Sequence, residues 1–124
     1  MSLVLIVEDN EKNMKLARDI LQAKGYQTVE AETGEVGVKL ARERKPDLVL
    51  MDIQLPGING IEAFRQIRAE PTTARIPVIA LTASVTPTDR SAITAAGFDA
   101  FIGKPINLKE FVDTVRRLAK GGEK

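Results

Sequence analysis

Five short apolar runs, separated by stretches with helical spacing, restrict the fold of this chain more than any other feature. The runs are Leu3–Val7, Thr28–Ala31, Leu48–Met51, Val78–Leu81 and Ala100–Ile102. Four of them are continuously apolar, which is typical of strands covered on both faces. The run Thr28–Ala31 alternates, with Val29 and Ala31 on one side, and this pattern predicts a strand at an edge of the sheet.

Apolar residues with helical spacing lie between the runs. Their predicted faces are Met14, Ala17 and Leu21, then Val36, Leu40 and Ala41, then Ile61, Phe64 and Ile67, and finally Leu108, Phe111, Val112, Val115 and Leu118. A further helix over 88–96 is short and alanine-rich, with Ile93 as its only large apolar residue. Strands and helices therefore alternate, which predicts an α/β fold with a parallel sheet and helices on both faces.

Several helix ends carry local signals. Gly25 is a stop signal for the first helix. Asn107 can cap the last helix, with Glu110 at the third helical position. Thr86 can cap the helix over 88–96, with Pro87 at its first position and Asp89 at its third.

Composition limits the class of protein. The 124 residues suit a single domain spanning 1–124, and the net charge of +1 offers no basic excess for a nucleic-acid backbone. No apolar run is long enough for a membrane span or a signal peptide. The lack of cysteine fits a reducing compartment, and we expect a cytoplasmic protein. The chain also lacks histidine, so histidine chemistry must come from a partner.

Polar side chains follow four of the predicted strands. They are Glu8-Asp9-Asn10, Asp52, Thr82-Ala83-Ser84 and Lys104-Pro105. Each has an ordinary explanation when taken alone, because Asp9 or Asn10 can cap a helix and strands often end in polar residues. Sites in open parallel sheets, however, form outside the carboxyl ends of the strands. Acids, a hydroxyl and an ammonium at one such edge therefore predict a functional site.

The acidic groups need compensation if the first and third strands are neighbours. Two like charges about 4 Å apart repel by roughly 4 kcal/mol near a protein surface. A raised pKa, a bound cation or the Lys104 ammonium could each relieve the repulsion among Glu8, Asp9 and Asp52. A hard ion such as Mg²⁺ prefers such oxygen ligands.

The same groups suit phosphoryl transfer. A carboxylate such as Asp52 can attack phosphorus and form an acyl phosphate. A cation held by Asp9 and Asp52, the Lys104 ammonium and the Thr82 hydroxyl could then neutralise or hydrogen-bond the phosphoryl oxygens.

The sequence resembles the CheY-like receiver domain of bacterial two-component response regulators. The matching segments are "VLIVEDN" (4–10), "PDLVLMDIQLPGINGIE" (46–62), "IPVIALTA" (76–83) and "FIGKP" (101–105), and the resemblance covers residues 3–119. Within this family the sequence is most similar to the single-domain DivK-type regulators. The resemblance implies a (βα)5 flavodoxin-like, doubly wound sheet of five parallel strands in the order 2-1-3-4-5.

The resemblance also implies a role for each site residue. Asp52 is the implied phosphorylation site. Asp9 is the implied direct ligand of Mg²⁺ or Mn²⁺, Glu8 acts through water, and Gln54 offers its backbone carbonyl.

The remaining implied roles concern the signal. Thr82 and Lys104 contact the phosphoryl group, and a cis peptide bond before Pro105 aims the lysine. Thr82 then moves and Phe101 turns inward, which changes the face formed by residues 88–96, 100–102 and 108–118. The implied protein is a signalling switch, not an enzyme, and assists only its own phosphorylation and autodephosphorylation.

The implied phosphoryl donor is a phosphohistidine on a sensor histidine kinase or a histidine phosphotransfer protein. Because the sequence ends soon after the last helix, we expect the output to be binding to another protein, by a monomer or a phosphorylation-dependent dimer. We expect no direct contact with nucleic acid or membrane.

Four alternatives remain open at this point. The chain could be an isolated receiver domain of a larger hybrid kinase or response regulator. A phosphatase of the haloacid-dehalogenase type also uses a strand-end Asp, but normally has a second Asp where this chain has Gln54. A flavodoxin-like electron carrier would place a phosphate where Glu8 and Asp9 would repel it. A degenerate receiver would bind partners without phosphorylation, yet every site position here is filled competently.

Overall fold

A computed structural model describes residues 2–83 and 87–119 of the chain, apart from the side chain of Asp89. The elements in chain order are β1 (Leu3–Val7), α1 (Glu11–Ala23), β2 (Gln27–Ala31), α2 (Gly34–Arg44), β3 (Leu48–Asp52), α3 (Gly60–Ala69), β4 (Val78–Thr82), α4 (Pro87–Ala96), β5 (Ala100–Gly103) and α5 (Leu108–Leu118). The predicted cap at Thr86 and the predicted strand-end residue Ser84 lie outside the described residues.

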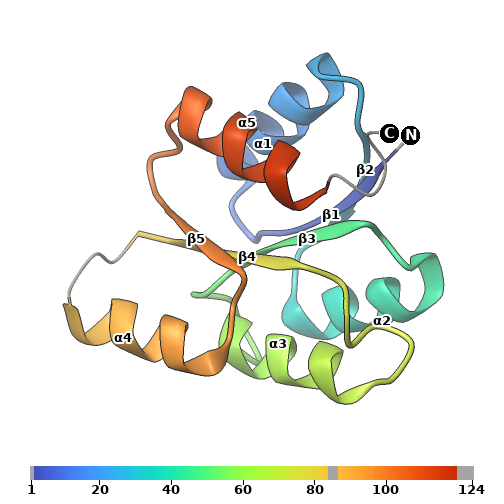
Figure 1. The fold of residues 1–124 in the computed structure, drawn as a ribbon, viewed down its shortest axis with the longest axis vertical. Coiled ribbons are helices and arrows are strands. Elements are labelled where there is room, and N and C mark those ends of the chain that lie inside the picture. Colours follow the sequence, from blue (N-terminus) through green and yellow to red (C-terminus); the bar gives the residue numbers. More distant parts are fainter. Residues whose placement is uncertain (1, 84–86, 120–124) are drawn as a thin grey trace.

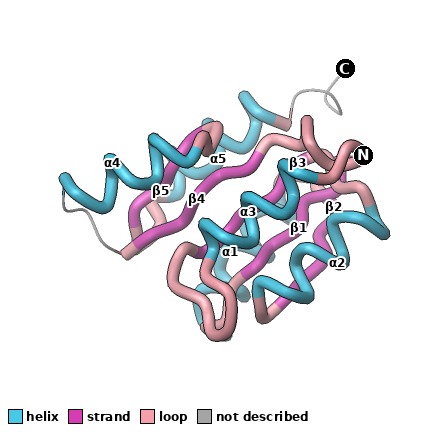
Figure 2. The backbone as a smooth tube through the Cα atoms, turned by 90° about the horizontal axis from the view of Figure 1, so that it is seen from below, coloured by secondary structure: helices cyan, strands magenta, loops and turns pink. Residues whose placement is uncertain are grey.

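All five strands pair in parallel in the order β2-β1-β3-β4-β5, so the predicted α/β fold and strand order are confirmed. Figure 2 shows the strands lying side by side in this order. The alternating strand β2 is at an edge, as predicted. The strand β5 forms the other edge, and its residues Ala100 and Phe101 are only half-buried.

The helices form two layers around the sheet. The helices α1 and α5 cover one face, and α2, α3 and α4 cover the other (Figure 1). Within β1, Val4 and Ile6 pack toward the first layer, and Leu5 and Val7 pack toward the second. Because both faces of the central strands are covered, every residue of β3 and β4 is buried.

The face predicted for α2 is partly wrong. Val36 is 43% exposed, whereas Gly37, Val38 and Ala41 are buried. A Cβ atom at Gly37 would lie 2.8 Å from Val7 Cγ2, so the helix lies close to the sheet at this glycine. The buried face was predicted from large apolar side chains, and glycine has none. The prediction therefore did not include Gly37 in the buried face of α2.

The first turn of α5 also differs from its predicted face. Phe111 and Val115 are buried as predicted, but Leu108 is 59% exposed. Packing against the sheet begins only at Phe111, one turn into the helix. The predicted cap is confirmed, because the Asn107 side chain accepts a hydrogen bond from the Glu110 N–H.

Among the described residues, none of the helices has the length and apolar character needed to cross a membrane.

Candidate functional site

The strand order creates a crevice between β1 and β3. From β1 the chain moves outward to β2, and from β3 it moves in the opposite direction to β4 and β5. The loops that follow β1 and β3 therefore leave their shared edge in different directions, and such a switch point is where ligands bind in open α/β sheets. Of the polar strand-end residues predicted from the sequence, those within the described part of the chain lie at the carboxyl ends of β1, β3, β4 and β5.

Three carboxylates converge in the crevice. Glu8 follows β1 and is 2% exposed, while Asp52 is the last residue of β3 and is 3% exposed. Asp9, the next residue after Glu8, is exposed. One oxygen from each of the three side chains lies within 4.8 Å of the other two. The structure thus brings together the acids that the sequence analysis expected to meet.

Lys104 reaches the same crevice from the end of β5. Its Nζ donates a hydrogen bond to Asp52 Oδ2 over 3.0 Å and forms an ion pair with Glu8 Oε1 at 2.9 Å. The backbone N–H of Lys104 donates to the Thr82 carbonyl over 2.8 Å, which extends the contact between β4 and β5 beyond the last strand pair. The Lys104–Pro105 peptide bond is cis.

The charges shift each other's protonation equilibria. Burial, together with the adjacent Asp52 carboxylate, raises the pKa of Glu8 to about 7 although Lys104 acts in the opposite direction. Burial alone would lower the pKa of Lys104, but its contacts with Glu8 and Asp52 outweigh this effect and raise the pKa above its ordinary value. The repulsion among the three carboxylates is therefore relieved in two of the ways considered from the sequence: Glu8 has a raised pKa, and Lys104 contacts Glu8 and Asp52.

Backbone groups fix the two buried carboxylates. The Gln54 N–H donates to Asp52 Oδ1 over 3.0 Å, and the Asn10 N–H donates to Glu8 Oε2 over 3.2 Å. The Asn10 side chain caps α1 by accepting a hydrogen bond from the Asn13 N–H. Capping is thus the role of Asn10, and the ordinary reading of Asp9 as a cap does not hold.

Thr82 and Phe101 occupy neighbouring strands. Thr82 ends β4, is buried, and pairs in register with Gly103 of β5. Phe101 lies on β5 with the Arg90 guanidinium 4.8 Å from its ring centroid. A cavity of about 270 Å³ between α4 and β5 is lined by Phe101, Arg90 and Phe98, among others. The aromatic ring therefore lies next to open space and not in the core.

The donor set fits a hard divalent cation. Among the described residues, the crevice brings three carboxylates together with the ammonium of Lys104, which contacts both Glu8 and Asp52, so the acids outnumber the cation. Oxygen ligands of this kind are those that Mg²⁺ and Mn²⁺ prefer. The acidic cluster therefore fits a metal site.

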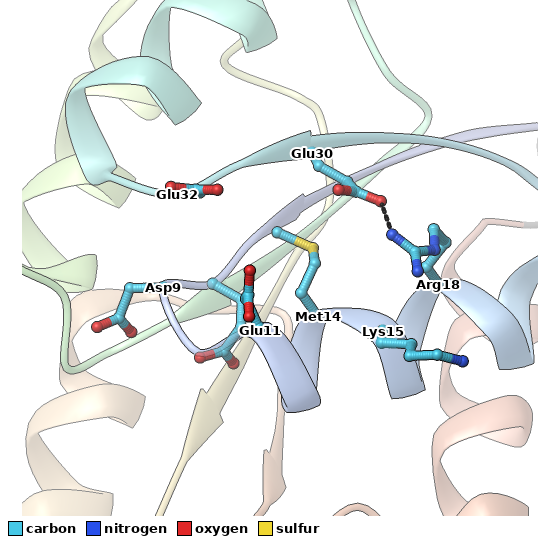
Figure 3. Close-up of a pocket in the computed structure, with 8 residues that line it drawn as sticks. Asp9, Glu11, Met14, Lys15, Arg18, Glu30 and Glu32 are labelled. Atoms are coloured by element: carbon cyan, nitrogen blue, oxygen red, sulfur yellow. Dashed lines mark hydrogen bonds and ion pairs between the residues drawn. The ribbon is translucent and has the colours of Figure 1, made fainter.

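A second hollow adjoins the crevice along α1 and β2. It has a volume of about 310 Å³, and its lining includes Asp9, Glu11 and Glu32 as well as Glu8. Figure 3 shows Asp9 and Glu11 toward one end and the ion pair between Arg18 and Glu30, 2.8 Å apart, toward the other. The approach to the acidic cluster from this side is thus lined mainly by carboxylates.

Comparison with known proteins identifies the family of this chain. Residues 4–116 match the response regulator receiver domain family. The chain belongs to this family. This receiver domain is 45% identical over 113 residues to the polar-differentiation response regulator DivK of Brucella anthropi, an alignment that covers 91% of this chain and 92% of DivK.

Solved structures give the same result. The receiver domain of a sensor histidine kinase from Pseudomonas aeruginosa PAO1, described with a magnesium ion coordinated in its active-site cleft, is 33% identical with a TM-score of 0.90. That alignment covers 96% of this chain and 98% of the other. The chemotaxis regulator CheY4 of Vibrio cholerae shares the fold, with a TM-score of 0.88 at 24% identity and coverage of 95% and 98%. This receiver domain is thus part of a family of two-component signalling switches that are expected to interact with histidine kinases.

One contact at the site carried no sequence signal. Glu35, at the start of α2, accepts a hydrogen bond from the Ile58 N–H in the loop after β3. In the sequence Glu35 is only an acid in the first turn of a helix, a position where acids are common. The contact with Ile58 depends on the packing of α2 beside α3, which sequence spacing does not reveal.

Proposed function

We propose that this receiver domain accepts a phosphoryl group from a partner's phosphohistidine onto Asp52, in the presence of Mg²⁺, and thereby switches its binding to another protein. The observation that carries the proposal is the placement of Asp52. Its buried carboxylate is held by Lys104 Nζ and the Gln54 N–H and lies beside two further acids at the switch point of the sheet. That arrangement places a nucleophilic carboxylate beside a cation and beside the acids that could hold a metal ion.

In the proposed step, an Asp52 carboxylate oxygen attacks phosphorus and forms a new P–O bond. The P–N bond to the partner's imidazole breaks, and the imidazole leaves with the electron pair and takes up a proton. Lys104, already 3.0 Å from Asp52, neutralises charge on the phosphoryl oxygens, and the Thr82 hydroxyl at the end of the adjacent strand donates to one of them. Positioning and charge stabilisation supply most of what phosphoryl transfer needs.

Mg²⁺, or Mn²⁺, would be held by Asp9, Asp52, the backbone carbonyl of Gln54 and, through water, Glu8. When bound, the ion neutralises negative charge between the carboxylates and the incoming phosphoryl group. The crowding of three acids around a single ammonium supports this assignment. The magnesium ion described for the related Pseudomonas aeruginosa receiver domain supports it as well.

The proposed switch links Asp52 to the face formed by α4, β5 and α5. The phosphoryl group adds negative charge and acceptor oxygens, and Thr82 moves toward them. Phe101, on the strand next to Thr82 and beside the cavity under α4, then turns inward. The result is a shift between two conformations that a partner distinguishes by its differential affinity.

The donor in this scheme is a sensor histidine kinase or a histidine phosphotransfer protein, because the chain has no histidine of its own.

Incubation with acetyl phosphate and Mg²⁺, followed by intact mass measurement, tests the proposal. We expect the mass of one added phosphoryl group in the wild type and none in Asp52→Asn. The matched control Asp113→Asn alters an exposed carboxylate on α5 and should accept phosphate normally. An unchanged wild-type mass with the metal present, or steady release of phosphate from general monoesters, would contradict the proposal.

A further inference from the structure

The first turn of α2 contacts the loop that follows Asp52. Glu35 Oε2 accepts a hydrogen bond from the Ile58 N–H over 3.3 Å, between residues 23 positions apart. The same carboxylate lies against Gly57, whose φ is +74°, and a Cβ atom at Gly57 would be 2.7 Å from Glu35 Oε2. The carboxylate therefore packs directly on the glycine backbone at the tip of the loop.

Gly34, the residue before Glu35, contacts the same part of the loop. A Cβ atom at Gly34 would lie 2.7 Å from Ile58 Cγ1 and 3.0 Å from the Ile58 carbonyl oxygen. Because no side chain stands between them, the helix and the loop approach to backbone distance. The start of α2 thus meets the loop tip through one hydrogen bond and one close packing contact.

The base of the loop is attached to the phosphoacceptor. The Gly60 N–H donates to the Ile53 carbonyl over 2.9 Å, and a Cβ atom at Gly60 would be 2.2 Å from the Asp52 carbonyl oxygen. The Gln54 N–H donates to Asp52 Oδ1 over 3.0 Å. The loop over 53–59 therefore runs from the Asp52 carboxylate at its base to Glu35 at its tip.

We propose that Glu35 is a positioning residue for the Asp52 site, which holds the tip of the loop over 53–59 so that the Gln54 backbone stays at the metal and phosphoryl position. This inference rests on the proposed function. Because Gly57 can adopt many backbone conformations, the loop would sample more of them if the hydrogen bond to Glu35 were lost. A smaller fraction of molecules with the loop in place weakens the apparent affinity for a ligand of the site by the same factor.

The experiment compares the wild-type chain of 124 residues with Glu35→Ala, Glu35→Gln and Glu43→Ala. Glu43 is an exposed acid on the same helix, so its variant changes the same charge without touching the loop. Mg²⁺ affinity is measured by calorimetric titration, the rate of phosphorylation by acetyl phosphate is measured by intact mass, and amide hydrogen exchange is followed at residues 53–60. Urea unfolding reports global stability separately.

We expect Glu35→Ala to weaken Mg²⁺ binding about three- to tenfold, as the loss of one hydrogen bond implies, and to speed exchange in the loop. Glu35→Gln retains an acceptor oxygen, but a neutral one that makes a weaker hydrogen bond than a carboxylate, so this variant should lie between the wild type and Glu35→Ala. Glu43→Ala should match the wild type in every measurement.

The inference is overturned if Glu35→Ala binds Mg²⁺ and exchanges its loop amides like Glu43→Ala, or if Glu35→Gln loses as much as Glu35→Ala. The two hypotheses fail in different ways. If the wild type binds Mg²⁺ but gains no phosphate, the proposed function is refuted. The hydrogen exchange of the amides at residues 53–60 would still test whether Glu35 holds the loop.

Discussion

Lys104 Nζ donates a hydrogen bond to Asp52 Oδ2 over 3.0 Å and so joins residues that lie 52 positions apart in the sequence. The same ammonium is 2.9 Å from Glu8 Oε1. Both carboxylates are almost fully buried, and the lysine side chain is 13% exposed. Lys104 is therefore the counterion that the protein itself supplies for two buried acids, in addition to any role in phosphoryl transfer.

Replacement of this counterion should destabilise the metal-free protein in a pH-dependent way. We expect Lys104→Ala to lower the free energy of unfolding by about 2–3 kcal/mol near pH 8, because two buried carboxylates lose their partner. The loss should shrink near pH 5, where Glu8 takes up a proton. Urea unfolding at both pH values measures this change. Lys109→Ala, which removes an exposed ammonium paired with Asp113, is the matched control and should have no measurable effect. An equal loss for Lys104→Ala at both pH values would refute the counterion role.

The raised pKa of Glu8 should be visible in the stability of the metal-free protein. Between about pH 4.5, its ordinary pKa, and about pH 7, the folded protein keeps a proton on Glu8 that the unfolded chain has released. The wild type therefore loses stability relative to Glu8→Gln as the pH rises through this window, by up to about 3 kcal/mol. Denaturant unfolding of both proteins with a chelator present checks the difference. A constant difference between the two proteins across the window would show that Glu8 titrates normally.

Mg²⁺ binding should be coupled to the same proton. Because Glu8 carries a proton below about pH 7, binding becomes tighter as the pH rises through that value and releases protons below it. Calorimetric titration in two buffers with different ionisation enthalpies counts these protons. Glu8→Gln should bind more weakly and release none, whereas Asp9→Asn should bind more weakly but keep the release. Proton release that persists in Glu8→Gln would assign the titration to another group.

Gly60 should tolerate no side chain. A Cβ atom there would lie 2.2 Å from the Asp52 carbonyl oxygen and 2.8 Å from Ile53 Cα, and neither backbone atom can move freely. We expect Gly60→Ala to cost about 3 kcal/mol or more of unfolding free energy. Gly25→Ala provides the comparison, because its φ of +93° is strained for alanine but nothing lies within 4 Å, so it should cost only about 1–2 kcal/mol. Equal costs in urea unfolding would mean that the loop after β3 shifts to accept the methyl group.

Much of the fold could be predicted from local patterns. The uninterrupted apolar runs predicted the buried strands β1, β3 and β4, and the alternation of Val29 and Ala31 placed β2 at an edge. The errors have a common cause. Val36 and Leu108 belong to helical patterns but are exposed, because burial depends on how close each turn of a helix comes to the sheet.

The candidate site was predictable as a set of strand ends, but not as a geometry. Sequence spacing gave Glu8, Asp9, Asp52, Thr82 and Lys104 as polar residues after apolar runs. It did not give the raised pKa of Glu8, because that depends on burial beside Asp52. The contact between Glu35 and Ile58 could not be predicted either, because it joins the start of α2 to the loop after β3, two segments that are far apart in the sequence.

The sequence by itself determined where strands and helices alternate and which residues end each strand, because these features depend on side chains only a few positions apart. Only the tertiary structure decided that the ends of β1, β3 and β5 share one crevice with Lys104 between two acids. The physical reason is that the same alternating pattern is compatible with several strand orders, and each order would bring different strand ends, and thus different charges, together.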